Sequence, residues 1–132
     1  MKTYVIDDEE ISVYLTKYML IEENFSEDIN TFLSAEEALQ ELQQNLKIAP
    51  PRIIFIDLNM PGMNGWEFLD ELVPYKSHML NHCWIYILTS SLDLNDAARA
   101  KEYELVQGFI HKTIDKDDIE EIKSKIKEHA TW

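Results

Sequence analysis

Five short apolar runs alternate with longer segments of helical periodicity, and this alternation constrains the fold of the chain more than any other feature. The runs are Tyr4–Ile6, Ile29–Leu33, Ile53–Ile56, Cys83–Leu88 and Val106–Ile110. Most are apolar on both faces, which is typical of parallel strands covered by helices on each side. Because such crossovers are right-handed, the pattern predicts a flavodoxin-like α/β fold, a doubly wound parallel sheet of order 2-1-3-4-5 in three αβα layers. Ile29–Leu33 is the most polar run, so we expect it at an edge.

The segments between the runs carry helical stripes. The first stripe consists of four large apolar residues, Ile11, Leu15, Tyr18 and Met19. We expect this stripe to pack on the sheet. Four further helices are predicted: from Ala35, from Gly65 to Val73, from Asp93 to Tyr103 and from Lys116. The helix from Asp93 offers mainly small alanines as apolar groups, so it should be the most weakly anchored.

Length and charge narrow the function classes. With 132 residues and 45% hydrophobic composition, the chain fits one globular domain, 1–132. The net charge of −13 disfavours nucleic acid and anionic membrane surfaces as partners. Neither a membrane-length apolar run nor a signal-peptide core is present, so we expect a cytoplasmic protein. The lone Cys83 lies inside an apolar run and is interpreted as a core residue.

Polar residues follow the ends of four runs. They are Asp7 and Asp8 after the first run, Asp57 and Asn59 after the third, Thr89 after the fourth and Lys112 after the fifth. Because the carboxyl ends of parallel strands meet at one edge of the sheet, we expect these side chains to converge. Neighbouring carboxylates repel each other and favour a bound cation. Hard oxygen ligands favour Mg²⁺, which commonly takes only one or two protein carboxylates together with a phosphate oxygen.

This set of residues suits phosphoryl transfer. Asp57 can be the nucleophile, Asp7 and Asp8 can hold Mg²⁺, and Lys112 and Thr89 can bind phosphoryl oxygens. Each residue alone also has an ordinary interpretation: acids at a helix N-terminus, a turn aspartate, a cap or a surface lysine. Their joint placement at one edge of the sheet favours the functional interpretation.

Four segments in this order, VIDDEE, IIFIDLNMPGMNG, YILTSS and GFIHK, resemble the receiver domain of two-component response regulators. The likeness covers nearly the whole chain. It implies that Asp57 accepts a phosphoryl group from a histidine kinase or a histidine phosphotransfer protein. It also implies that Mg²⁺ is bound by Asp8, Asp57 and the Asn59 carbonyl, with Asp7 acting through a metal-bound water.

The same resemblance assigns roles to further residues. Thr89 would be the hydroxyl that moves toward the phosphoryl group, and Lys112 the lysine that pairs with it. Phe109 would be an aromatic switch, although a plain core role is an equal alternative. Asn59 and Ser91 occupy positions that tune dephosphorylation in this family.

One departure concerns the residue after the lysine. Receiver domains usually continue with proline through a cis peptide bond, whereas this chain has Lys112-Thr113. A cis bond before a residue other than proline costs about 2.5–4 kcal/mol, so the sequence leaves open whether this bond is cis or is trans with a less well-aimed Lys112.

We expect output through an unknown protein target, at a surface formed by the helix from Asp93, the strand Val106–Ile110 and the helix from Lys116. The expected organisation is a single receiver domain with no output domain, unless the chain is a fragment. Apart from self-dephosphorylation, no turnover of an external substrate is expected. Two alternatives stay open: a receiver-like interaction module that is never phosphorylated, and a phosphatase of the haloacid-dehalogenase kind. A phosphatase of that kind would need a second acidic residue at the position where this chain has Asn59.

Overall fold

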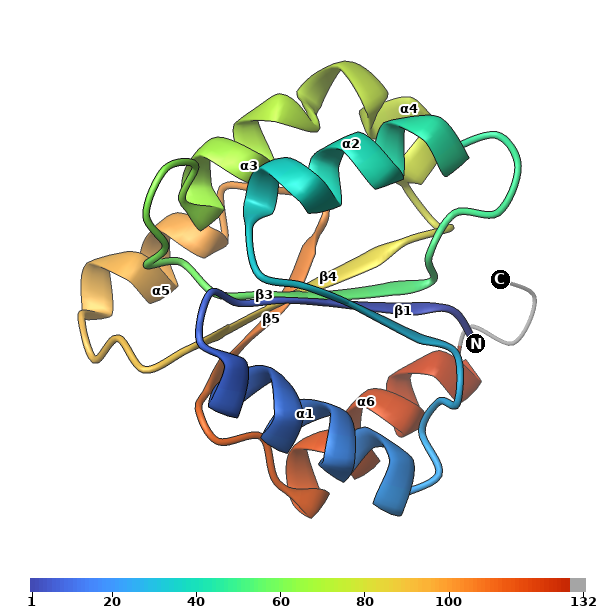
Figure 1. The fold of residues 1–132 in the computed structure, drawn as a ribbon, viewed down its shortest axis with the longest axis vertical. Helices are drawn as coiled ribbons and strands as arrows, with labels where there is room; N and C mark the ends of the chain where they lie inside the picture. Colours follow the sequence, from blue (N-terminus) through green and yellow to red (C-terminus); the bar gives the residue numbers. More distant parts are fainter. Residues whose placement is uncertain (129–132) are drawn as a thin grey trace.

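Five parallel strands form one sheet in the computed structural model, which describes residues 1–128 (Figure 1). The strands are β1 Thr3–Ile6, β2 Ile29–Phe32, β3 Ile53–Ile56, β4 Trp84–Thr89 and β5 Val106–His111. Their order is β2-β1-β3-β4-β5, which confirms the predicted flavodoxin-like topology. The most polar strand, β2, lies at an edge, as predicted. The last four positions of the predicted domain, 129–132, lie outside the described residues.

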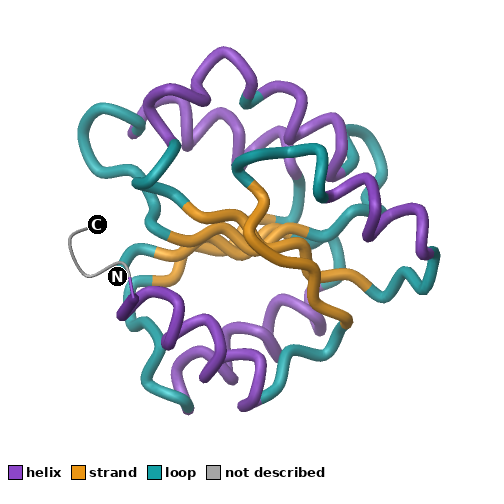
Figure 2. The backbone as a smooth tube through the Cα atoms, turned by 180° about the vertical axis from the view of Figure 1, so that it is seen from behind, coloured by secondary structure: helices purple, strands orange, loops and turns teal. Residues whose placement is uncertain are grey.

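Helices cover both faces of the sheet, so the fold has three layers (Figures 1 and 2). The helices are α1 Glu10–Glu22, α2 Ala35–Asn45, α3 Gly65–Glu71, α4 Lys76–Met79, α5 Leu94–Ala100 and α6 Lys116–Glu128. Helices α1 and α6 lie on one face, and α2 and α3 lie on the other. None of the helices among residues 1–128 is long and apolar enough to cross a membrane.

Two hydrophobic clusters, one on each face, hold the layers together. Strand β3 contributes to both, because its side chains alternate: Ile54 and Ile56 belong to the cluster with α2 and α3. Ile53 and Phe55 belong to the cluster with α1 and α6. All four β3 residues are buried. A strand that is apolar at every position therefore needs helices on both faces, as the sequence indicated.

Helix α1 departs from the prediction. The residues that it buries are Val13, Thr16 and Leu20. Three residues of the predicted stripe are exposed, Ile11 by 76%, Leu15 by 40% and Tyr18 by 50%. Met19 alone among them is partly buried against the sheet. Apolar residues occur around much of this helix, so periodicity did not identify the inward face, where the compact Val13 and Thr16 fit closely.

The chain between β3 and β4 also differs in detail. Asn64 and Glu67 form a capping box that begins α3 at Gly65. The helix ends at Glu71 rather than at Val73, and a 3₁₀ turn over Val73–Tyr75 leads into α4. Helix α4 was not predicted. Thr89 proves to be the last residue of β4 rather than the first residue after it, and α5 is shorter than predicted.

Candidate functional site

The carboxylates of Asp7 and Asp57 lie side by side because β1 and β3 are neighbours. Ile6 pairs with Ile56, so the residue that follows each strand emerges at the same edge of the sheet. Each of Asp7, Asp8 and Asp57 has a carboxylate oxygen within 4.8 Å of such an oxygen in the other two. Asp7 and Asp57 are each only 3% exposed, while Asp8 is half-buried. The structure thus brings together the predicted acids.

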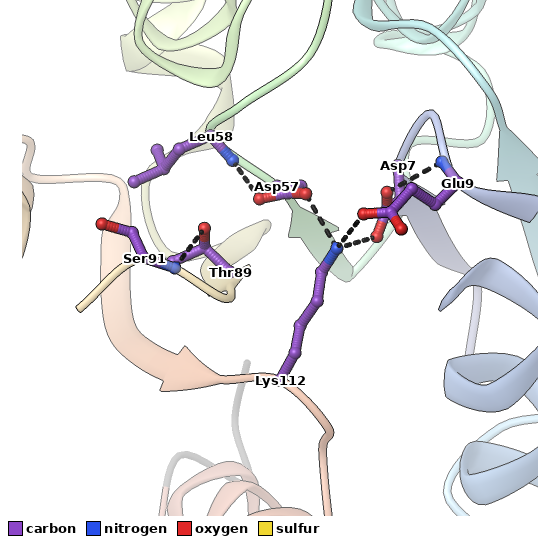
Figure 3. A network of polar contacts seen from close by, with 7 residues as sticks. All are labelled: Asp7, Glu9, Asp57, Leu58, Thr89, Ser91 and Lys112. Atoms are coloured by element: carbon purple, nitrogen blue, oxygen red, sulfur yellow. Dashed lines mark hydrogen bonds and ion pairs between the residues drawn. The ribbon is translucent and has the colours of Figure 1, made fainter. Parts of the chain in front are cut away.

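Backbone N–H groups orient two of these carboxylates. The N–H of Leu58 donates to Asp57 Oδ1 at 2.7 Å, and the N–H of Glu9 donates to Asp7 Oδ1 at 3.0 Å. The remaining oxygen of each group, Oδ2, faces the centre of the site (Figure 3). Hydrogen bonds of this kind fix the orientation of a carboxylate.

Lys112 bridges the two buried carboxylates. Its Nζ lies 2.6 Å from Asp7 Oδ2 and 2.8 Å from Asp57 Oδ2 (Figure 3). The exposed Glu9 carboxylate is more distant, at 3.6 Å from the same Nζ. Burial, the largest single effect, lowers the pKa of Lys112, but its hydrogen bonds to Asp57 and Asp7 together with their charges raise it above the ordinary value. Lys112 is therefore a cation wherever the protein is folded near neutral pH.

The peptide bond between Lys112 and Thr113 is cis. The sequence left the isomer of this bond open, and in the structure Lys112 reaches both carboxylates. The backbone N–H of Lys112 also donates to the Thr89 carbonyl oxygen at 2.9 Å, which places the end of β5 beside the end of β4.

Thr89 and Ser91 line the other side of the site. Thr89 is fully buried, and its Oγ1 accepts a hydrogen bond from the Ser91 N–H at 3.3 Å (Figure 3). The Ser91 hydroxyl in turn donates to Asp96 Oδ2, on α5, at 2.6 Å. Asn59 lies on the loop after β3 and its side chain is exposed.

Phe109 is half-buried on β5, at the wall of a cavity of about 190 Å³. The cavity lies between β5 and α5 and is also lined by Ala97, Ala100 and Val106. The Phe109 ring meets the His111 ring edge to face, with their centroids 5.8 Å apart. Phe109 therefore lies next to the helix that the sequence indicated as weakly anchored.

Gly65, the first residue of α3, packs directly against the Asp57 backbone. A Cβ at this position would lie 2.7 Å from the Asp57 carbonyl oxygen, closer than real Cβ atoms approach. The Gly65 N–H donates to the Leu58 carbonyl oxygen at 3.0 Å. The loop after β3 is thus closed tightly onto the strand that carries Asp57.

Sequence reasoning missed a cluster that links α5 to α3. The Arg99 guanidinium lies 4.5 Å from the Trp66 ring centroid, and the Tyr103 ring stacks on Trp66 at 5.7 Å. The Tyr103 hydroxyl donates to Asp70 Oδ1 at 2.8 Å. Burial, followed by this hydrogen bond, raises the pKa of Tyr103. No spacing rule relates Trp66 to Arg99, because the two residues meet only when the fold is formed.

The acidic cluster fits Mg²⁺ in the chemistry of its donors. Asp7, Asp8 and Asp57 offer hard carboxylate oxygens, which Mg²⁺ prefers over nitrogen or sulfur. The cluster is half-open at Asp8, so water can complete an octahedral shell. Lys112 contacts two of the three acids and therefore shares them with any bound cation.

A doubly wound sheet with this set of residues at its carboxyl edge has the fold and the site of a receiver domain of two-component signalling. The family model described as the response regulator receiver domain matches residues 3–123. The chain belongs to this family. Receiver domains act as phosphoacceptors rather than as enzymes that turn over external substrates, and they bind Mg²⁺ through an acidic cluster of this kind.

Solved structures share the whole fold. A two-component response regulator from Cytophaga hutchinsonii is 29% identical with a TM-score of 0.89, and the match covers 96% of each chain. A response regulator receiver domain protein from Clostridium thermocellum is 25% identical with a TM-score of 0.74, again over 96% of each chain. A receiver protein from Dyadobacter fermentans shares the fold at 21% identity and a TM-score of 0.82, over 98% of this chain and 97% of that one. No curated protein matches the chain.

Proposed function

We propose that this chain is a phosphoacceptor of a two-component or phosphorelay system in which Asp57 receives a phosphoryl group from a phosphohistidine. The observation that carries the proposal is the buried Asp57 carboxylate, which faces the Lys112 ammonium at 2.8 Å beside two further acids. Phosphoryl transfer requires a positioned nucleophile and stabilisation of charge. A buried Asp57 carboxylate with a fixed cation at 2.8 Å supports both.

In the transfer step, one bond to phosphorus would form and another would break. One oxygen of Asp57 attacks phosphorus, and the bond between phosphorus and the donor imidazole nitrogen breaks, leaving its electron pair on the imidazole. The Leu58 N–H orients the Asp57 carboxylate, and Lys112 neutralises charge on the phosphoryl oxygens. The buried Thr89 hydroxyl is available as a hydrogen-bond donor to the same oxygens.

Asp7, Asp8, Asp57 and the Asn59 carbonyl would hold Mg²⁺, which when bound neutralises charge that develops on the phosphoryl oxygens. Asp7 would act mainly through a metal-bound water. Asp8 is the most accessible of the three acids, so it can bind a cation without displacing Lys112 from Asp7 and Asp57.

Phosphorylation would replace the single negative charge of the Asp57 carboxylate by a phosphoryl group of about −1.5 to −2 charges, and the local structure must respond to this change. Lys112 has to exchange a carboxylate oxygen for a phosphoryl oxygen. Thr89 would turn its hydroxyl toward the group, and Phe109 would move beside the cavity under α5. The surface of α5, β5 and α6 would then bind a protein target.

The exposed apolar stripe of α1 supports a protein as the phosphoryl donor. Five large apolar residues are involved, Ile11, Tyr14, Leu15, Tyr18 and Ile21, with exposed fractions between 40% and 76%. Helix α1 begins at Glu10, just after the acidic pair, so the stripe starts beside the site. A contiguous exposed apolar patch is typical of an interaction surface. A histidine kinase or phosphotransfer protein bound there would present its phosphohistidine to Asp57.

The test is intact mass after incubation with acetyl phosphate, with and without Mg²⁺, for the wild type and Asp57→Asn. We expect a gain of one phosphoryl group that requires both Mg²⁺ and Asp57. If neither acetyl phosphate nor a cognate kinase produces this gain, the proposal fails and an unphosphorylated interaction module is the better account. Sustained phosphate release from small monoesters would instead favour the phosphatase alternative.

A further inference from the structure

The fold turns the hydroxyl of Ser91 away from the acceptor carboxylate. Ser91 Oγ donates to Asp96 Oδ2 at 2.6 Å and accepts from the Asp93 N–H at 3.2 Å. In Figure 3 the Ser91 side-chain oxygen points away from Asp57, whereas its N–H points to Thr89. A separation of 2.6 Å is typical of a hydroxyl that donates to an ionised carboxylate, one of the stronger hydrogen bonds in proteins.

Ser91 nevertheless borders the site. Its backbone nitrogen lies 3.3 Å from Thr89 Oγ1, the hydroxyl that faces the acceptor region. A serine side chain has three staggered positions about its single torsion, and a change of rotamer would carry the hydroxyl to another side of the backbone. The contact with Asp96, the shorter of the two, holds the hydroxyl in its outward rotamer together with the bond from the Asp93 N–H.

We propose that Asp96 is a positioning residue that lengthens the lifetime of a phosphoryl group on Asp57 by holding the Ser91 hydroxyl away from it. This inference rests on the proposed function. In hydrolysis, a water oxygen attacks phosphorus and the bond from phosphorus to Asp57 breaks. Its electron pair restores the carboxylate, and both hydrogens of the water leave with the inorganic phosphate.

A hydroxyl beside the phosphoryl group could accept a hydrogen bond from that water and orient it for attack. In the outward rotamer, the Ser91 proton is donated to Asp96 and one oxygen lone pair accepts from Asp93, so the hydroxyl gives no such help. Loss of the Asp96 carboxylate would remove the shorter of the two hydrogen bonds that hold the hydroxyl outward and let it populate other rotamers. The effect of Asp96 should therefore depend on Ser91.

Asp96 lies in the first turn of α5. A displacement of α5 would lengthen or break the bond to Ser91. The lifetime of the phosphoryl group would consequently respond to any partner that binds or moves this helix. Binding of a protein target at α5 would thus change how long Asp57 stays phosphorylated.

The experiment measures the decay of the phosphorylated protein by intact mass after removal of acetyl phosphate, in the presence of Mg²⁺. Asp96→Ala should decay roughly tenfold faster than the wild type, the kinetic equivalent of one oriented hydrogen bond of about 1.4 kcal/mol. In a Ser91→Ala background, the additional Asp96→Ala change should leave the decay rate unaltered. Asp96→Asn should decay close to the wild-type rate, because its amide oxygen can still accept from Ser91.

Glu102→Ala is the matched control. Glu102 follows α5 and its side chain is exposed. The substitution removes one acid from the same segment and leaves the Ser91–Asp96 bond and the cap of α5 in place, so its phosphoryl lifetime should match the wild type.

Three outcomes would overturn the inference while leaving the proposed function intact: an unchanged lifetime in Asp96→Ala, an equal acceleration in the Ser91→Ala background, or the same acceleration in Glu102→Ala. A wild-type protein that takes up no phosphoryl group from any donor would overturn both.

Discussion

The ammonium of Lys112, which follows β5, lies 2.8 Å from a carboxylate oxygen of Asp57, which follows β3, so the lysine side chain reaches past the intervening strand β4. The same ammonium contacts Asp7 at 2.6 Å. One ammonium thus pairs with two carboxylates that are almost fully removed from solvent.

Removal of this cation should leave the two buried acids unpaired. We expect Lys112→Ala to lower the free energy of unfolding by about 3 kcal/mol in the absence of divalent cations, because an uncompensated buried charge is costly. The variant should bind Mg²⁺ severalfold more tightly than the wild type and recover much of the lost stability. Denaturant unfolding with and without Mg²⁺ measures both effects.

Lys116→Ala removes an exposed lysine from the same segment and is the control. Equal Mg²⁺ affinity in Lys112→Ala and the wild type would show that Lys112 does not share its acids with the metal.

The pKa of Lys112 is raised in the folded protein. The contribution of Lys112 to the free energy of unfolding is therefore present below about pH 10.4, the ordinary lysine value, and is lost only as the pH rises through the higher folded value.

The α1 stripe gives a second prediction. Ile11→Ser should slow phosphotransfer from a cognate phosphohistidine donor at least severalfold, while its reaction with acetyl phosphate should stay unchanged, because only the protein donor needs the docking surface. Ile48→Ser is the matched control, since Ile48 is 81% exposed against 76% for Ile11 but lies at the opposite end of the sheet, before β3. Equal transfer rates in the two variants would argue against docking on α1.

The cluster around Trp66 should stabilise α5. We expect Arg99→Ala to lower the free energy of unfolding by about 0.5–1 kcal/mol, the usual contribution of an exposed cation–π contact. Hydrogen exchange should increase over α5, which buries only Ala100. Lys101→Ala removes the same charge without touching the Trp66 ring, and comparable exchange in both variants would count against a specific role for Arg99.

Cys83 should be chemically inert in the native protein. It is 2% exposed, and burial raises its pKa to about 12, so the reactive thiolate is scarce below that pH. A thiol reagent such as DTNB at pH 8 should label the native protein very slowly and the unfolded protein completely. Rapid stoichiometric labelling under native conditions would contradict this picture.

The sheet could be predicted from sequence because runs such as Ile53–Ile56 are apolar on both faces. Such a run is stable only as a strand that is covered on both sides. The convergence of Asp7, Asp57 and Lys112 followed from a topological rule that requires no knowledge of side-chain contacts. The inward face of α1 could not be predicted, because a helix with apolar residues on several sides has no unique stripe. The bond from Ser91 to Asp96 depends on the register between a loop and a short helix, which periodicity does not encode.

The close packing of Gly65 on the Asp57 backbone bears on attempts to build this chemistry elsewhere. Since a Cβ at residue 65 would collide with the Asp57 carbonyl, the start of α3 can lie this close to the end of β3 only with glycine at that position. A designer who grafts Asp57 alone onto another parallel sheet would lose the loop whose Leu58 N–H orients its carboxylate. Asp57 should be moved together with the continuous segment from Ile53 to Gly65, and the glycine that ends this segment is as necessary as the aspartate.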